Sequence, residues 1–84
     1  MPEQEVTLDN EVGLHARPAA VFAKKAASFD CDIKLVKDGN EANAKSIMSV
    51  LKLDVTKGDA VTIRTEGEGA EEALSDLVEL VGSL

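Results

Sequence analysis

A single histidine stands among residue types that suit phosphoryl chemistry. Residues 13–18 read Gly-Leu-His-Ala-Arg-Pro, so Arg17 follows His15 by two positions and Pro18 follows it by three. An imidazole nitrogen can act as a nucleophile that forms a covalent intermediate. A guanidinium is always charged and can donate two parallel hydrogen bonds to phosphate oxygens. These residues could therefore accept a phosphoryl group on His15 and stabilise it through Arg17.

Pro18 indicates where the first helix begins. Proline is tolerated only in the first turn of a helix, where its missing N–H has no partner to lose. Apolar residues recur at helical spacing from there, namely Ala19, Phe22, Ala23 and Ala26. We therefore expect the helix to begin within about a turn before Pro18, with His15 at or next to its N-cap. The free backbone N–H groups of Ala16 and Arg17 would then bind the phosphoryl group, and the positive helix end would favour the neutral imidazole.

Ser46 is a second candidate, because it directly precedes a short apolar segment. That segment contains Ile47, Met48, Val50, Leu51 and Leu53. The hydroxyl of Ser46 is well suited to cap a short helix that begins after it. On physical grounds alone, this capping role is the preferred interpretation of the serine.

The apolar residues of this second helix also predict a docking surface. A two-layer domain buries only one side of a surface helix, so not all of them can lie in the core. We predict that Val50 and Leu53 are buried, and that Met48 is exposed together with either Ile47 or Leu51. Flexible apolar side chains suit a protein that meets several partners. From the first helix we add Ala20 and Lys24 to this docking surface, although a solvated helix face explains Lys24 equally well.

The remaining pattern predicts one α+β domain over residues 1–84. Short alternating segments around Val6, Ile33 and Ile63 indicate strands, and Asp38-Gly39 is typical of a tight hairpin that leads into a short strand near residues 40–43. Apolar residues from Ala70 to Leu84 keep one helical stripe. There are too few strands for a doubly wound parallel sheet, so we expect helices on one face of a mixed or antiparallel sheet.

Composition excludes several classes of function. The 84 residues carry 16 acidic and nine basic side chains, a net charge of -7, so a nucleic-acid partner is not expected. The single cysteine, Cys31, allows no intramolecular disulfide, and the acidic N-terminus lacks the pattern of a secretory signal. We expect a cytoplasmic protein without membrane insertion. No spacing of residues indicates a metal ligand set, a nucleotide loop or an enzyme's paired carboxylates, so no cofactor is expected.

Two motifs in register resemble a known family. Residues 13–19, Gly-Leu-His-Ala-Arg-Pro-Ala, and residues 43–48, Asn-Ala-Lys-Ser-Ile-Met, are similar to those of HPr, the histidine-containing phosphocarrier of the bacterial phosphoenolpyruvate-dependent sugar phosphotransferase system. The resemblance covers essentially the whole chain. It implies an open-faced two-layer sandwich in the order βαββαβα, with three helices on one face of a four-stranded antiparallel sheet. Asp54 departs from the pattern, because many members carry glycine there, and this leaves the turn after the second helix open.

The resemblance also implies roles for the candidate residues. His15 would take a phosphoryl group on Nδ1 from phospho-enzyme I and donate it to the sugar-specific A components of permeases, assisted by Arg17. The protein would act as a monomeric stoichiometric carrier and not as an enzyme.

Ser46 resembles the serine that a regulatory kinase phosphorylates in many Gram-positive bacteria, a modification that favours binding to a transcriptional regulator. An alternative is therefore a regulatory binding module of the same fold, which acts in carbon catabolite control through Ser46 and the adjacent apolar patch. Relatives that work only in that way lack the acceptor histidine, so His15 favours the carrier.

Overall fold

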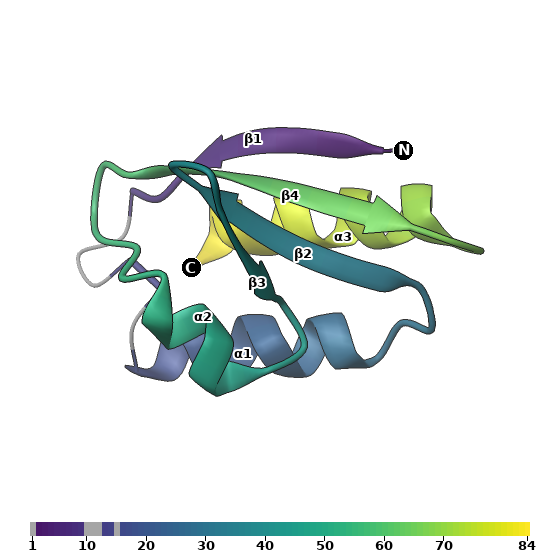
Figure 1. Cartoon of the computed structure of the whole chain (residues 1–84), viewed down its shortest axis with the longest axis horizontal. Helices are drawn as coiled ribbons and strands as arrows, with labels where there is room; N and C mark the ends of the chain where they lie inside the picture. The colour runs from purple at the N-terminus through teal and green to yellow at the C-terminus, as the bar shows by residue number, and fades with distance from the viewer. Residues whose placement is uncertain (1, 10–12, 15) are drawn as a thin grey trace.

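Four strands and three helices form the part of the chain that the computed structural model describes, residues 2–9, 13–14 and 16–84. Their order is β1 (Glu3–Thr7), α1 (Ala16–Ala27), β2 (Asp32–Lys37), β3 (Asn40–Asn43), α2 (Ile47–Lys52), β4 (Ala60–Glu66) and α3 (Ala70–Ser83). The strands form one antiparallel sheet in the order β1-β4-β2-β3, and the helices cover one of its faces (Figure 1). The predicted α+β sandwich is confirmed.

The core lies between the sheet and the helices. Strand β4 pairs with both β1 and β2, and its residues alternate between a buried face and a partly exposed face, as a half-covered sheet requires. Phe22 of α1 and Leu77 of α3 are fully buried against this sheet. The hydroxyl of Thr65, also fully buried, donates to the carbonyl of Ala70 at 2.8 Å and so joins β4 to the start of α3.

Local turn chemistry explains how the strands end. Asp38 and Gly39 have φ angles of 51° and 83°, which is the left-handed pair that a two-residue hairpin needs, and the predicted hairpin between β2 and β3 is confirmed. Strand β1 ends at Thr7. Leu8 lies just beyond the strand, where its side chain is fully buried in the core and its backbone pairs with Gly58 and Asp59.

Asp54 forms the turn that the sequence left open. Its φ of 53° is in the left-handed region that glycine adopts most easily, and aspartate is one of the few other residues that enters this region. The Nζ of Lys37 donates to the carbonyls of Leu53 at 3.3 Å and of Asp54 at 2.7 Å. Lys37, the last residue of β2, thus links the end of that strand to the turn that follows α2.

The carboxylate of Asp59 holds the loop that follows α2. It accepts hydrogen bonds from the N–H and the hydroxyl of Thr56, both at 2.9 Å, and lies 3.0 Å from the Nζ of Lys37. The N–H of Thr56, the Lys37 ammonium and the Thr56 hydroxyl together lower the pKa of Asp59 from 3.8 to about 2. A carboxylate with a lowered pKa stabilises the fold fully above its unfolded pKa and loses that contribution as the pH falls through its folded pKa.

We therefore expect Asp59→Asn to change how stability depends on acid. The free energy of unfolding, measured with urea from about pH 6 to about pH 2, should differ between wild type and variant by a constant amount above about pH 4. Below that pH the difference should shrink, because the wild-type carboxylate becomes protonated. A difference that is the same at both ends of this range would contradict the assigned hydrogen bonds.

Candidate functional site

Helix α1 begins where the sequence predicted. Its first residue is Ala16, the one that follows His15 in the chain, and Pro18 is the third. The expected start within about a turn before Pro18 is thus confirmed. His15 itself lies outside the described residues, so its place at the helix end remains a prediction. Arg17 lies in the first turn and is exposed to solvent.

The electrostatics of this helix start favour an anion. No acidic residue lies in the first turn of α1, and the helix as a whole carries three basic residues and no acidic one. The unpaired N–H groups at a helix N-terminus carry a partial positive charge, which here is not opposed by a carboxylate of the same helix. Within a chain of net charge -7, α1 is therefore a basic segment.

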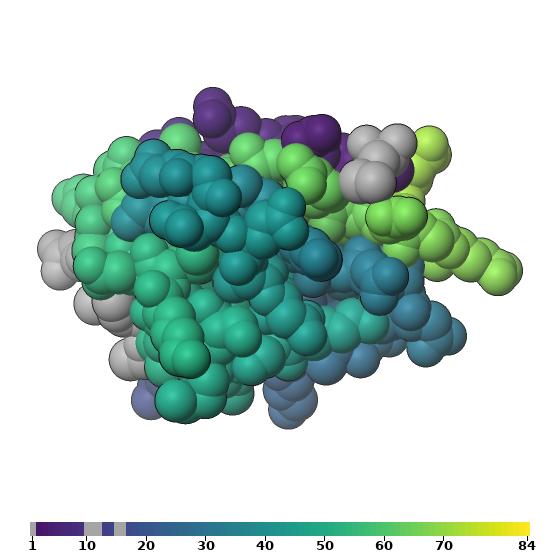
Figure 2. Space-filling model, viewed as in Figure 1, coloured from purple at the N-terminus to yellow at the C-terminus, as the bar shows by residue number. Residues whose placement is uncertain are grey.

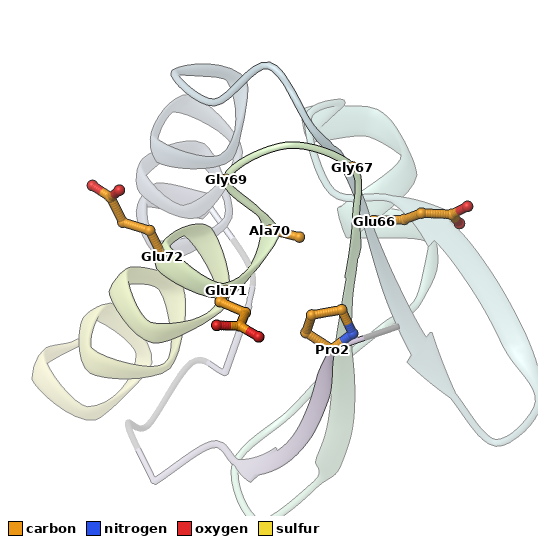
Figure 3. Close-up of a pocket in the computed structure, with 7 residues that line it drawn as sticks. All are labelled: Pro2, Glu66, Gly67, Gly69, Ala70, Glu71 and Glu72. Carbon is orange, nitrogen blue, oxygen red and sulfur yellow. The ribbon is translucent and has the colours of Figure 1, made fainter.

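Helix α3 begins in the opposite electrostatic environment. Glu71 and Glu72 lie in its first turn, and with Glu66 and Pro2 they are among the residues that line a shallow hollow (Figure 3). These carboxylates already interact favourably with the positive helix end and repel a further anion. Of these two helix starts, that of α1 therefore favours an anion and that of α3 does not.

The chain just before α1 is fixed against a distant segment. Leu14 is fully buried, and its N–H donates to the carbonyl of Val55 at 2.9 Å. Gly13 is buried beside it with a φ of 57°, and a Cβ at this position would lie 2.7 Å from the Cα of Thr56 and even closer to the Val55 carbonyl. Glycine is therefore required here for close approach of two backbones as well as for its φ.

Ser46 caps α2 as expected. Its backbone is extended and its Oγ accepts a hydrogen bond from the N–H of Ser49 at 3.4 Å. The side-chain oxygen Oδ1 of Asn43 accepts a hydrogen bond from the backbone N–H of Lys45 at 3.0 Å. The Nζ of Lys45 donates to the carbonyl of Phe29 at 2.6 Å. These contacts fasten the segment before Ser46 to the residues that follow α1.

Helix α2 presents part of its apolar surface to solvent. The helix lies on the molecular surface (Figure 2). Met48 and Ile47 are 67% and 45% exposed. Val50 is fully buried, as predicted. Leu53 was predicted to be a core residue, but it only packs against the core and stays partly exposed, because the helix has ended and the chain turns away at this residue. Leu51 has the same intermediate burial.

Two docking candidates come from α1. Ala20 is partly buried and Lys24 is exposed. Lys24 lines a shallow apolar hollow with Val21 and with Leu80 of α3. Val21, which is 40% exposed, was not predicted as a surface residue. Its exposure could have been predicted, because Val21 lies outside the apolar stripe formed by Ala19, Phe22, Ala23 and Ala26.

The described residues contain no cluster of three or more metal-ligating side chains. None of the helices in this part of the chain has the length and apolar character needed to cross a membrane.

Comparison with known proteins identifies the family. Residues 2–83 match the family model described as the PTS HPr component phosphorylation site. The chain is 45% identical to the phosphocarrier protein HPr of Vibrio cholerae over 100% of this chain and 99% of that protein. It is also 44% identical to the HPr-like protein Crh of Bacillus subtilis, over 96% of this chain and 95% of that protein.

A solved structure agrees with this match. The crystal structure of the phosphocarrier protein HPr from Bacillus anthracis superimposes with a TM-score of 0.91 and 44% identity, over 94% of each chain. Sequence, element order and sheet topology thus point to one family. The chain belongs to the HPr family of phosphocarrier proteins.

Proposed function

We propose that this protein carries a phosphoryl group on His15, receives it from phospho-enzyme I and passes it to the sugar-specific A components of permeases. The observation that supports this most is the start of α1 at the residue after the only histidine, with Arg17 and no acidic residue in the first turn. Membership of the HPr family supports the same role. The chain acts as a stoichiometric carrier and not as an enzyme with its own small substrate.

The interactions available at this helix start suit a group that must be held and then released. A helix N-terminus stabilises an anion by about 0.3 to 1 kcal/mol. A hydrogen bond from a charged donor such as Arg17 adds about 1.5 to 3 kcal/mol. A total of a few kcal/mol retains a phosphoryl group without making its transfer to the next protein unfavourable. The backbone N–H groups of Ala16 and Arg17 and the guanidinium of Arg17 would provide these contacts.

The test is phosphorylation in a reconstituted relay. Wild-type protein incubated with enzyme I and labelled phosphoenolpyruvate should gain one phosphoryl group per chain that is stable in base and labile in acid, as expected for a phosphohistidine. A reaction without enzyme I is the control. If the protein stays unlabelled while the same enzyme I labels another HPr, the proposed carrier function is wrong.

Similarity to Crh supports a second role for the same surface. Ser46 is partly exposed at the start of α2, next to the exposed side chains of Ile47 and Met48. A phosphate at a helix N-terminus is tolerated electrostatically, and it adds negative charge to the surface that partners contact. We propose that a serine kinase modifies Ser46, which slows phosphoryl transfer and favours a transcriptional regulator in carbon catabolite control.

The docking surface consists of Ala20, Lys24, Ile47, Met48 and Leu51, and Met48 is its most exposed large apolar side chain. We expect Met48 to be among the few interface residues whose truncation costs more than about 1 kcal/mol, so Met48→Ala should weaken binding of enzyme I about tenfold, or about 1.4 kcal/mol. Its free energy of unfolding should change by less than about 0.5 kcal/mol. Titration calorimetry and urea unfolding measure the two quantities.

Val50→Ala is the matched control for this variant. Val50 lies on the same helix but is fully buried, so its truncation should destabilise the fold by about 1 to 3 kcal/mol. If Met48→Ala destabilises the protein as much as Val50→Ala, Met48 is a packing residue and the docking surface is misassigned.

We further propose that the protein acts as a monomer in the cytoplasm and requires no cofactor.

A further inference from the structure

Lys37 contacts three acceptors that come from separate positions in the chain. At the end of β2, its Nζ lies 3.3 Å from the carbonyl oxygen of Leu53, 2.7 Å from that of Asp54 and 3.0 Å from the carboxylate of Asp59. The side chain is only 18% exposed. An ammonium has three N–H donors and no acceptor, so three converging acceptors match its full hydrogen-bonding capacity. We refer to Lys37 and these three acceptors as the Lys37 clamp.

The clamp holds the chain on both sides of Val55. Asp54, which precedes Val55, is held through its carbonyl by Lys37. Thr56, which follows Val55, is held through its N–H and hydroxyl by Asp59, the carboxylate that also pairs with Lys37. The fully buried Val55 between them presents its carbonyl to the N–H of Leu14 at 2.9 Å. The position of that carbonyl therefore depends on the clamp.

The same segment also anchors the chain that leaves β1. The N–H of Gly58 donates to the carbonyl of Leu8 at 2.7 Å, and the N–H of Leu8 donates to the carbonyl of Asp59 at 3.0 Å. Leu8 and Leu14, both fully buried, are thus attached to residues 55–59. The next residue after Leu14 in the sequence is the proposed phosphoryl acceptor.

We propose that Lys37 is a positioning residue for phosphoryl transfer: through the Lys37 clamp it fixes the Val55 carbonyl and thereby the Gly13-Leu14 backbone that leads into His15. This inference rests on the proposed function. In this proposal the effect of Lys37 is transmitted by the hydrogen bond from the N–H of Leu14 to the carbonyl of Val55. Transfer between two proteins depends steeply on the geometry of the acceptor, so small displacements of this backbone lower the rate.

The test compares Lys37→Met with Lys34→Met in the full chain. Lys34 belongs to the same strand and carries the same charge, but its side chain is 53% exposed and its contact is an ion pair with Glu41 at 3.5 Å. Phosphorylation by enzyme I is measured at a temperature well below the unfolding of every variant. Lys37→Met should lower the maximal rate about three- to tenfold and leave the apparent KM within about twofold of wild type. Lys34→Met should transfer at the wild-type rate.

Hydrogen exchange distinguishes positioning from a general loss of stability. In Lys37→Met the amide of Leu14 should lose at least about tenfold more protection than the amide of Ile63 in the centre of the sheet. The reason is that the hydrogen bond of Leu14 can then open by local unfolding, while that of Ile63 still requires unfolding of the sheet. Equal losses at both amides would mean that Lys37 only stabilises the fold and would overturn the proposal. Should Lys37→Met fail to fold, Lys37→Arg replaces it. The guanidinium of Lys37→Arg keeps the positive charge, but its planar shape does not match the three acceptors that converge on the ammonium of Lys37. We therefore expect a smaller decrease in rate than in Lys37→Met.

The outcomes separate the two proposals. If wild-type protein accepts no phosphoryl group, the carrier function fails. If wild type is labelled and Lys37→Met is labelled at the same maximal rate, the carrier function stands and the positioning role of Lys37 is wrong. An equal decrease in Lys37→Met and Lys34→Met would show an effect of net charge and would also overturn the positioning role.

Discussion

His15→Ala is expected to abolish the acid-labile phosphorylation of this protein by enzyme I and phosphoenolpyruvate. The chain has one histidine, so no second imidazole can replace the acceptor nitrogen. Arg17 and the N-terminus of α1 remain in the variant, but they only stabilise a phosphoryl group and cannot form a covalent bond to it. The measurement is the acid-labile label per chain after the wild-type reaction has reached its plateau.

Ser46→Ala is the matched control, since it removes the other proposed phosphorylation site and keeps His15. It should be labelled by enzyme I as fully as wild type. With a serine kinase and ATP the pattern should reverse, so that His15→Ala gains an acid-stable phosphate and Ser46→Ala gains none. Acid-labile label that persists in folded His15→Ala would show that another residue accepts the phosphoryl group.

Gly13→Ala is expected to give the largest loss of stability among the substitutions considered, about 2 to 5 kcal/mol. A left-handed backbone costs a residue with a Cβ about 1 to 2 kcal/mol. The φ of Gly13 is 57°, and the added carbon would also overlap the backbone of Val55 and Thr56. Forcing extra atoms into a packed site costs a further 1 to 3 kcal/mol or so. Urea unfolding at neutral pH measures the change.

Gly58→Ala separates these two contributions. Gly58 also has a positive φ, 89°, but a Cβ there would meet no atom within 4 Å. Its substitution should therefore cost only the backbone term, about 1 to 2 kcal/mol. If Gly13→Ala proves no more destabilising than Gly58→Ala, the backbone of Gly13 does not lie in close contact with Val55 and Thr56.

Much of the fold could be predicted because its signals are local. Pro18 fixes the start of α1 within a turn, Asp38-Gly39 specifies the hairpin between β2 and β3, and the apolar stripe from Ala70 specifies α3. The pairing of the Leu8 backbone with Gly58 and Asp59 could not be predicted, because an apolar residue pattern shows which side chains are buried and not which loop their backbone meets. Periodicity reports which side chains are buried, not which backbone groups meet.

The candidate site was predictable only in part, for the same reason. Ser46 and Val50 follow from capping and helical spacing, and Met48 follows from the limited apolar surface that one short helix can bury. The Lys37 clamp leaves no such trace, because Lys37 is 16 residues from Leu53 and 17 from Asp54. The sequence marked Asp54 only as a departure from the family pattern. Its left-handed backbone conformation became visible only in the structure.

The hydrogen bond from Leu14 to Val55 has a consequence for newly made protein. A ribosome makes Leu14 long before Val55, about forty residues later in the sequence, and chains acquire such distant contacts only after both parts have left the ribosome. A nascent chain that ends before Val55 contains His15 but lacks the carbonyl that fixes the preceding backbone. We therefore expect the Gly13-Leu14 backbone to be held in place only in chains that already include Val55.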